Sequence, residues 1–484
     1  MSLVAEDILI VLPEIIVSLM ACLILVLDLY LPARLRAWTS FSLALVTLLI
    51  TGLIILSNSD SNSVVGLNSL VVKDQISDLL KAGICLFSAV VFVYSRRYAL
   101  ERGFWRGEYV VLGLFGVVGM MIMTSAYHLL TVYIGVELLA LCLYAMVGMQ
   151  RDSIPASEAA MKLFVLGALA SGVLLYGMSL LYGLTGTLVI SEMSTEVGQI
   201  GTPGLPLILA LILVVTGLLF KIGAVPFHMW VPDVYEGAPT STTLFLAAAP
   251  KLAACAMILR LLAEGLEGLF QTWQEMLIAA SLFSVVLGNV VAIAQKNIKR
   301  MLAYSAISHM GFFLLGILSG TAMGYSAALT YILIYGVITL GVFGVVLTLT
   351  RQGTEADLIE DYKGLNHQHP WLAFLMLLLM FSLAGVPPTI GFYAKLSVLQ
   401  SVIDAELAWV AVIAVISAVV GAFYYLRIVK IMYFESPDTG TDIQLNCGNA
   451  QHLILSLNAL VVVAAMPWIG TLAEICSQAV ASIR

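Results

Sequence analysis

Residues 205 to 230 read LPLILALILVVTGLLFKIGAVPFHMW, and this stretch decides the class of fold. The part before Lys221 carries no charge and has the length and composition of a helix that crosses a lipid bilayer. A cation at that depth costs about 2.5 to 3.5 kcal/mol on insertion scales, so Lys221 indicates a functional site. Pro226 interrupts the helix five residues later, and His228 follows it. A charge, a helix break and a titratable imidazole therefore lie close together.

The whole chain has the composition of a polytopic membrane protein. It has 484 residues, of which 61% are hydrophobic and 11% charged, and its mean hydropathy is +1.03. Soluble domains are about 45 to 50% apolar and about 25% charged. Runs of roughly 20 apolar residues predict an all-α protein with about fourteen transmembrane helices. They lie near 8–29, 39–57, 78–95, 109–127, 129–149, 162–183, 205–225, 242–264, 275–295, 301–319, 324–350, 371–397, 408–434 and 452–475.

The basic residues predict the orientation of these helices. If the N-terminus lies outside, fifteen of the 22 Lys and Arg residues fall on the inner side and three lie within the membrane. Four fall on the outer side, among them Lys81 and Arg260. This positive-inside asymmetry predicts that both termini face the outer, periplasmic side of a bacterial plasma membrane.

The sequence shows no motif for a cofactor, a metal ion or a nucleic acid. The longest polar connections, 57–77, 184–204, 351–370 and 435–451, are too short to bury a core of their own. The sequence has neither a glycine-rich phosphate loop nor a nucleotide fingerprint, and its six cysteines lack CxxC spacing. We therefore expect no redox cofactor, nucleotide or metal ion in this chain.

Four ionisable residues lie well inside apolar runs: Glu137, Lys221, Lys251 and Lys395. Each lysine can be explained as a member of a static ion pair or as a side chain that extends to the membrane surface. Three cations, however, have only one evident anion within the membrane. An unpaired ammonium in an apolar environment gives up its proton more readily than one in water. The set therefore favours a proton relay.

A second helix break strengthens this interpretation. The sequence GAVP at 223–226 is echoed by AGVP at 384–387, where two prolines are adjacent. Paired interrupted helices in two halves are typical of inverted-repeat transporters. We predict repeats of five helices each at 109–264 and 273–434, flanked by helices 1 to 3 in 1–108 and by a loop and a last helix in 435–484. Ordinary proline kinks are the alternative explanation.

Two histidines are candidates for proton transfer. His228 lies two residues after Pro226, and His309 lies inside the tenth predicted span. Imidazole titrates near physiological pH, so either residue can relay a proton. Either can equally be a neutral, hydrogen-bonded core residue.

Three segments together resemble a known family. They are FKIGAVPFHMWVPDVYEGAPTSTTLFLAAAPKLA (220–253), QKNIKRMLAYSAISHMGF (295–312) and SLAGVPPTIGFYAKL (382–396). They are similar to the antiporter-like membrane subunits of respiratory complex I, the proton-translocating NADH:quinone oxidoreductase. Their sequence is most similar to the N-type branch of this family, which is itself similar to subunit 2 of mitochondrial NADH dehydrogenase. The resemblance covers most of 109–434.

The resemblance implies a function and a set of residues. It implies that Glu137, Lys221, Lys251 and Lys395 translocate protons. It also implies that NADH, FMN, iron–sulfur clusters and quinone are bound by other subunits of the complex, and that this chain works beside further membrane-arm subunits rather than as a lone monomer. Two alternatives remain: a subunit of a multisubunit sodium/proton antiporter with the same fold, and a purely structural spacer.

Overall fold

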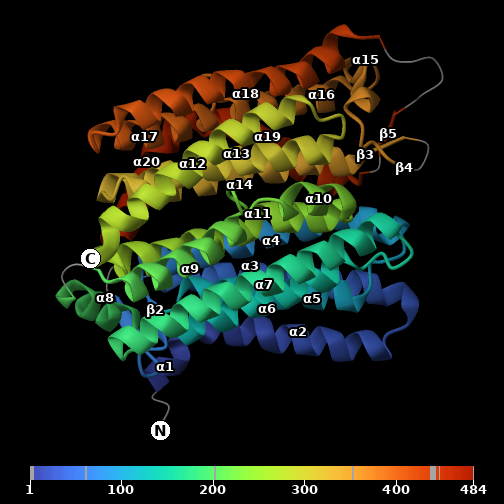
Figure 1. The fold of residues 1–484 in the computed structure, drawn as a ribbon. Helices are drawn as coiled ribbons and strands as arrows, with labels where there is room; N and C mark the ends of the chain where they lie inside the picture. Colours follow the sequence, from blue (N-terminus) through green and yellow to red (C-terminus); the bar gives the residue numbers. More distant parts are fainter. Residues whose placement is uncertain are drawn as a thin grey trace.

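The structure is a computed structural model, and it describes residues 5–59, 63–200, 203–351, 354–436, 443–445 and 447–482. These residues are almost all helical, which confirms the predicted fold class. The long helices run side by side in one bundle (Figure 1). The N-terminal half of the chain forms the lower part of the bundle in this view, and the C-terminal half forms the upper part.

Twelve helices in the described part of the chain are long and apolar enough to cross a membrane. They are α2 (Leu12–Tyr30), α3 (Ala33–Ser57), α4 (Gln75–Glu101), α5 (Gly107–Thr124), α6 (Leu129–Val147), α7 (Ile154–Thr185), α9 (Leu205–Ile222), α11 (Thr240–Ile258) with its π-helical extension η1 (Leu259–Glu264), α12 (Phe270–Ile293) with the preceding η2 (Glu267–Leu269), α13 (Ile298–Leu318), α14 (Ala322–Thr348) and α18 (Ala408–Phe434). Each matches one of the predicted apolar runs.

The two remaining predicted spans are divided. The last one consists of α19 (Asn449–Ala464), η4 (Met466–Trp468) and α20 (Ile469–Ala481), with a bend of 58° at the break, and counts as a thirteenth span if the pair crosses together. The predicted run 371–397 becomes α16 (Pro370–Ala384) and α17 (Ile390–Asp404), of 15 residues each. At about 1.5 Å per residue, neither is long enough to cross the bilayer core alone. The total of fourteen spans and the repeat boundaries stay predictions.

Short elements gather at the two ends of the bundle. The helices among them are α1 (Ala5–Ile10), α8 (Ile190–Gln199), α10 (Trp230–Gly237), η3 (Ile359–Tyr362) and α15 (Leu365–Gln368). The strands β1 (Val64–Gly66) and β2 (Val71–Lys73) pair antiparallel, as do β3 (Leu349–Arg351), β4 (Thr354–Glu355) and β5 (Ile443–Leu445) in the order β4-β3-β5. Figure 1 shows β3 to β5 and α15 at one end, with α1 and α8 at the other. These strands satisfy backbone groups of connections that were predicted only as loops.

The centre of the bundle is made by α11, α13 and α14. In the most apolar part of α11 and of α13, 94% of the residues are buried, whereas the value for α2 is 28%. A helix that is apolar on every side belongs inside a bundle, while α2 presents much of its surface to the outside. Lys251 and His309 lie on α11 and α13, so both start from the most buried helices.

Glycines allow two helix pairs to approach very closely. A Cβ added to Gly119 of α5 would lie 2.9 Å from the carbonyl oxygen of Gly135 in α6. A Cβ added to Gly288 of α12 would lie 2.7 Å from the backbone nitrogen of Ser308 in α13. Small residues at such crossings are typical of packed membrane helices. Each predicted repeat therefore opens with a glycine-mediated helix pair.

Candidate functional site

The first broken helix stops at Gly223. This residue adopts a left-handed conformation, with φ of 76° and ψ of 36°, that favours glycine. Ala224 donates its backbone N–H to the carbonyl of Leu219 at 2.9 Å, the pattern of a Schellman cap. The chain then runs non-helically past Pro226 and resumes as α10 at Trp230. A kink within one continuous helix does not describe this geometry.

The second broken helix repeats this local structure. Gly385 follows α16 with φ of 85° and ψ of 44°, and Val386 donates its backbone N–H to the carbonyl of Phe381 at 2.9 Å. Helix α17 begins at Ile390. The two breaks thus share the same glycine conformation and the same capping hydrogen bond, although they lie about 160 residues apart in the sequence.

Lys251 lies at the carboxyl end of the first half-helix. It extends from α11 and donates from its Nζ to the carbonyl of Ile222, the last residue of α9, at 2.6 Å. Its ammonium also lies 5.8 Å from the centroid of the Trp230 ring. The end of a helix carries a partial negative charge on carbonyls that lack intrahelical partners, which stabilises a cation there.

Lys395 occupies the matching place at the second break. Its Nζ donates to the carbonyls of Leu383 and Ala384, the last two residues of α16, at 2.8 and 3.0 Å. The ring centroid of Phe312 is 5.3 Å away. Although Lys395 follows the break in the sequence, its side chain turns back toward it. Its ammonium is therefore at the level of the break itself.

Lys221 and Lys251 line one small cavity. This space, of about 60 Å³, lies between α6, α7, α9 and α11, and Trp230 forms part of its wall. Lys221 donates from its Nζ to the hydroxyl of Ser171 on α7 at 3.0 Å. A cavity of this size with two polar groups can hold a few water molecules. The structure therefore brings together the two lysines that the sequence placed 30 residues apart.

Glu137 lies on α6 between Val136 and Leu139, which line the same cavity, but it does not line the cavity itself. Its charge acts electrostatically on Lys221. Among the described residues, however, no ion pair joins it to a lysine, and its Oε1 is buried without a hydrogen-bond partner. In this structure Lys221 therefore contacts Ser171 and not Glu137.

The two candidate histidines have different surroundings. His309 is buried, and its imidazole hydrogen bonds to the hydroxyls of Tyr331 and Tyr425 at 2.6 and 3.1 Å. His228 lies in the connection between α9 and α10 and is only partly buried. His309 on α13 therefore lies beside the second broken helix, and His228 lies in the first break.

The sequence analysis missed two groups of buried charges. Lys81 of α4 pairs with Glu14 of α2 at 2.6 Å. Arg260 pairs with Asp74 at 2.6 Å and with Glu264 at 3.2 Å. The sequence assigned Lys81 and Arg260 to the outer side without indicating any partner, and the structure shows both side chains 2% exposed inside the bundle. Glu14, within the first apolar run, was the available signal for an additional buried anion.

Ion pairs fix the position of α10. Asp233 accepts hydrogen bonds from Lys162 of α7 and Arg300 of α13, each at 2.8 Å, and Arg300 also pairs with Glu236 at 2.8 Å. These side chains line a polar cavity of about 420 Å³. Because Trp230 of the same short helix lines the lysine cavity, α10 contributes to the walls of both spaces. Helices from both predicted repeats hold it in place.

The Glu355 carboxylate joins three helices at the same end of the bundle. Glu355 accepts hydrogen bonds from Thr240, the first residue of α11, at 2.5 Å and from Lys299 of α13 at 3.0 Å, and it also contacts Tyr98 of α4. Burial opposes ionisation of Glu355, but the Lys299 ammonium and the two hydroxyls outweigh it and hold the pKa of this carboxyl well below its usual range. Glu355 thus fixes the start of the helix that carries Lys251.

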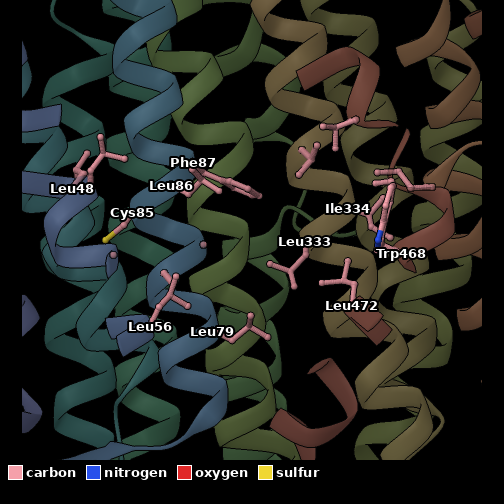
Figure 2. Close-up of a pocket in the computed structure, with 18 of the residues that line it drawn as sticks. Leu48, Leu56, Leu79, Cys85, Leu86, Phe87, Leu333, Ile334, Trp468 and Leu472 are labelled. Atoms are coloured by element: carbon pink, nitrogen blue, oxygen red, sulfur yellow. The ribbon is translucent and has the colours of Figure 1, made fainter. Parts of the chain in front are cut away.

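An apolar cavity lies apart from these charges. It measures about 510 Å³ and lies between α3, α4, α14 and the bent pair α19–α20. Figure 2 shows its apolar walls, with Leu48, Phe87, Leu333 and Trp468 around the space. None of the four lysine and glutamate candidates lines it. Its chemistry suits a hydrocarbon chain and not a proton.

Comparisons with known proteins agree on one family. The family model for the membrane subunits of NADH:quinone oxidoreductase and Mrp antiporters matches residues 126–421. NADH-quinone oxidoreductase subunit N of Thioalkalivibrio sulfidiphilus is 52% identical over 481 residues, which cover 99% of this chain and 100% of the relative. A chain of respiratory complex I from Thermus thermophilus is 29% identical, with a TM-score of 0.81 over 96% of this chain and 98% of that one. A chain of the Mrp complex from Dietzia has a TM-score of 0.82 over 97% of both chains but is 21% identical, which shows the fold alone.

Proposed function

The chain belongs to the family of NADH:quinone oxidoreductase and Mrp antiporter membrane subunits, among the N subunits of NADH-quinone oxidoreductase, and from this membership we propose that it moves protons through the charged residues at its two broken helices. The observation that carries the proposal is the position of Lys251 and Lys395. Each ammonium rests on the terminal carbonyls of a half-helix inside the bundle, and no carboxylate among the described residues forms an ion pair with either.

This arrangement suits a cation that is protonated and deprotonated in turn. A static ion pair would hold the charge permanently, because the loss of one partner leaves the other buried and uncompensated. Backbone carbonyls stabilise the ammonium less than a carboxylate does. Because they carry no net charge, they are not left as a buried, uncompensated charge when the lysine is neutral. Lys251 and Lys395 are therefore suited to hold a proton and to release it.

Glu137 is the proposed switch for Lys221. Two unit charges at 4 Å interact by about 4 kcal/mol at an effective dielectric constant of 20, whereas separation removes most of this energy. Closing the pair would keep Lys221 charged. Opening it would favour transfer of the proton through the shared cavity to Lys251. His309 would then transfer protons to and from Lys395. His228 would transfer protons at the first break.

The place of the chain in the cell follows from the same proposal. We assign it to the inner membrane of a bacterium, with both termini on the periplasmic side. Its neighbours would be other membrane-arm subunits of the complex, including further antiporter-like subunits. Other subunits would bind NADH, FMN, iron–sulfur clusters and quinone. Their redox chemistry would reach this chain only as a conformational change.

The sodium/proton antiporter is the alternative function. The Mrp chain shares the fold at 21% identity, while the N subunits of NADH-quinone oxidoreductase are about 50% identical over nearly the whole chain. The second value favours the complex I function. Under it, the assembled complex should pump protons with NADH in the absence of sodium.

The proposed function can be tested with Lys251→Met. Methionine is similar in length and apolar, so it keeps the packing of α11 while it removes the titratable group. We expect the assembled complex, reconstituted in liposomes, to move fewer protons per NADH oxidised. Lys430→Met is the control, because this lysine is 70% exposed and far from both breaks in the sequence. A wild-type ratio for Lys251→Met would reject the relay role of this residue.

A further inference from the structure

Hydroxyl groups from two other helices form hydrogen bonds with the imidazole of His309. Tyr331 of α14 hydrogen bonds to the imidazole Nδ1 at 2.6 Å, and Tyr425 of α18 hydrogen bonds to Nε2 at 3.1 Å. Both ring nitrogens therefore have a hydroxyl partner. The three residues are 2 to 6% exposed, so the contacts lie in the interior of the second half of the bundle.

A serine extends this chain of hydrogen bonds. The Tyr425 hydroxyl also bonds to the Oγ of Ser305, which lies one helical turn before His309 on α13. The sequence of contacts is therefore Ser305, Tyr425, His309 and Tyr331. Each of these groups can both donate and accept a hydrogen bond. A proton that enters at one end can therefore be matched by another that leaves at the far end.

A small gap joins the far end to the second broken helix. A cavity of about 10 Å³ is lined by His309, Tyr331, Ser382 and Ala394, together with other side chains of α14 and α17. This is about the space that one water molecule needs. Ser382 lies in the last turn of α16, and Ala394 is the neighbour of Lys395 in α17.

We propose that Ser305, Tyr425, His309 and Tyr331 form a proton wire that loads and unloads Lys395, so that Tyr331 and Tyr425 are proton-relay residues of this chain. The inference rests on the proposed function, because it needs Lys395 to exchange a proton. It adds residues that neither the helix breaks nor the buried charges identify. It also gives the second broken helix a hydrogen-bonded route of its own.

The transfer can be written with its protons balanced. Tyr425 gives its hydroxyl proton to Nε2 of His309 and takes one from Ser305, which takes its replacement from a water molecule. His309 releases the proton on Nδ1 to Tyr331, and Tyr331 passes its own proton through the water-sized gap to a neutral Lys395. One proton enters at Ser305 and one arrives at Lys395. Rotation of the hydroxyls and the reverse change of imidazole tautomer restore the starting state.

The competing explanation is that the hydroxyls only satisfy a buried imidazole. Under that explanation a tyrosine can lose its hydroxyl at a cost in stability, without a specific effect on proton transfer. Phenylalanine distinguishes the two, since it keeps the ring and removes only the relay atom. Tyr362→Phe is a matched control, because its hydroxyl is fully buried and has no hydrogen-bond partner among the described residues.

The experiment compares Tyr425→Phe, Tyr331→Phe and Tyr362→Phe in the assembled complex. Proton uptake driven by NADH is measured in inverted membrane vesicles, in H₂O and in D₂O, at matched levels of complex on native gels. We expect uptake to fall at least twofold in the first two variants, with a larger rate ratio between H₂O and D₂O. Tyr362→Phe should match wild type in both measurements. Ser305→Ala, a smaller change in the same wire, gives the test if a tyrosine variant fails to assemble.

Lys395→Leu is measured in parallel, to separate the wire from the function on which it rests. If this variant loses uptake while the assembled tyrosine and serine variants match wild type, the wire is rejected and the proposed function stands. If Lys395→Leu also pumps normally, the proposed function itself fails. A fall in uptake with an unchanged isotope ratio would assign the hydroxyls a structural role and overturn the wire.

Discussion

We expect the Lys395→Arg variant to assemble and yet to lose this chain's share of proton pumping. Arginine keeps the positive charge of lysine and several N–H donors, so it can still reach the carbonyls of Leu383 and Ala384 at the end of α16. It does not release its proton in a protein. The substitution therefore separates a relay from a cation that only stabilises the break.

The structure sets the magnitudes. Hydrogen bonds to charged groups contribute about 1.5 to 3 kcal/mol each, so the two bonds of Lys395 contribute about 3 to 6 kcal/mol, most of which arginine retains. The larger guanidinium must fit beside Gly385, which costs about 1 to 3 kcal/mol of packing. A guanidinium with a pKa above 12 is neutral in fewer than about one molecule in 10⁵ at pH 7. Assembly should survive, and proton exchange should not.

The assay is NADH-driven proton uptake into inverted membrane vesicles at matched levels of assembled complex. Lys395→Leu should also lose this chain's share of uptake, because it leaves no titratable group. Lys395→Glu should keep part of it, since a carboxyl can carry a proton. It will do so less well than lysine, because only its protonated form can donate, and its single O–H reaches one of the two carbonyls.

The relay argument would be refuted by an arginine variant that pumps like wild type. That result would show that a fixed positive charge at the break is sufficient. An arginine variant that fails to assemble leaves the leucine variant to decide, since leucine removes the steric problem. Normal uptake by Lys395→Leu would remove this residue from the pathway.

Three further predictions concern the other charges. Lys221→Ala should reduce proton pumping with assembly intact, measured as protons per NADH in liposomes; a normal ratio would exclude Lys221 as a relay. Glu137→Gln should impair pumping more than Glu137→Asp, because the carboxylate charge controls Lys221, and equal effects in the same assay would contradict this. Glu355→Gln should lower the free energy of unfolding in detergent by about 1 to 3 kcal/mol, because it breaks the ion pair with Lys299. The control is Glu158→Gln, whose side chain is 63% exposed and which should lower the same free energy by less than about 1 kcal/mol. Equal losses in a denaturation series would refute the proposed role of Glu355 at the start of α11.

Several features of the fold could be read from the sequence because the membrane imposes them. Without water in the bilayer core, a long apolar segment must form a helix that satisfies its own backbone. Composition and run length therefore predicted the all-α class and the approximate limits of the long helices. The two breaks were also visible, because glycine and proline act through local backbone geometry at Gly223 and Gly385.

The partners of the buried charges depended on tertiary structure. The sequence marked Lys221, Lys251 and Lys395 as unusual, but it could not show that two of them rest on the ends of half-helices, since the acceptor carbonyls look the same in every helix. It assigned Lys81 and Arg260 to the outer side from the distribution of basic residues, but it could not indicate a partner for either. Packing of α2, α4 and η1 supplies Glu14 and Asp74 as their buried partners.

The surroundings of His309 show the same limit. From the sequence it was one titratable residue among apolar neighbours, as compatible with the core as with proton transfer. Tyr331 and Tyr425 lie 22 and 116 residues away along the chain, and no periodicity or motif connects them to it. The sequence determined which residues are costly to bury in a membrane. Only the packing of α13, α14 and α18 decided which of them share hydrogen bonds, because those contacts are set by how separate helices meet in space.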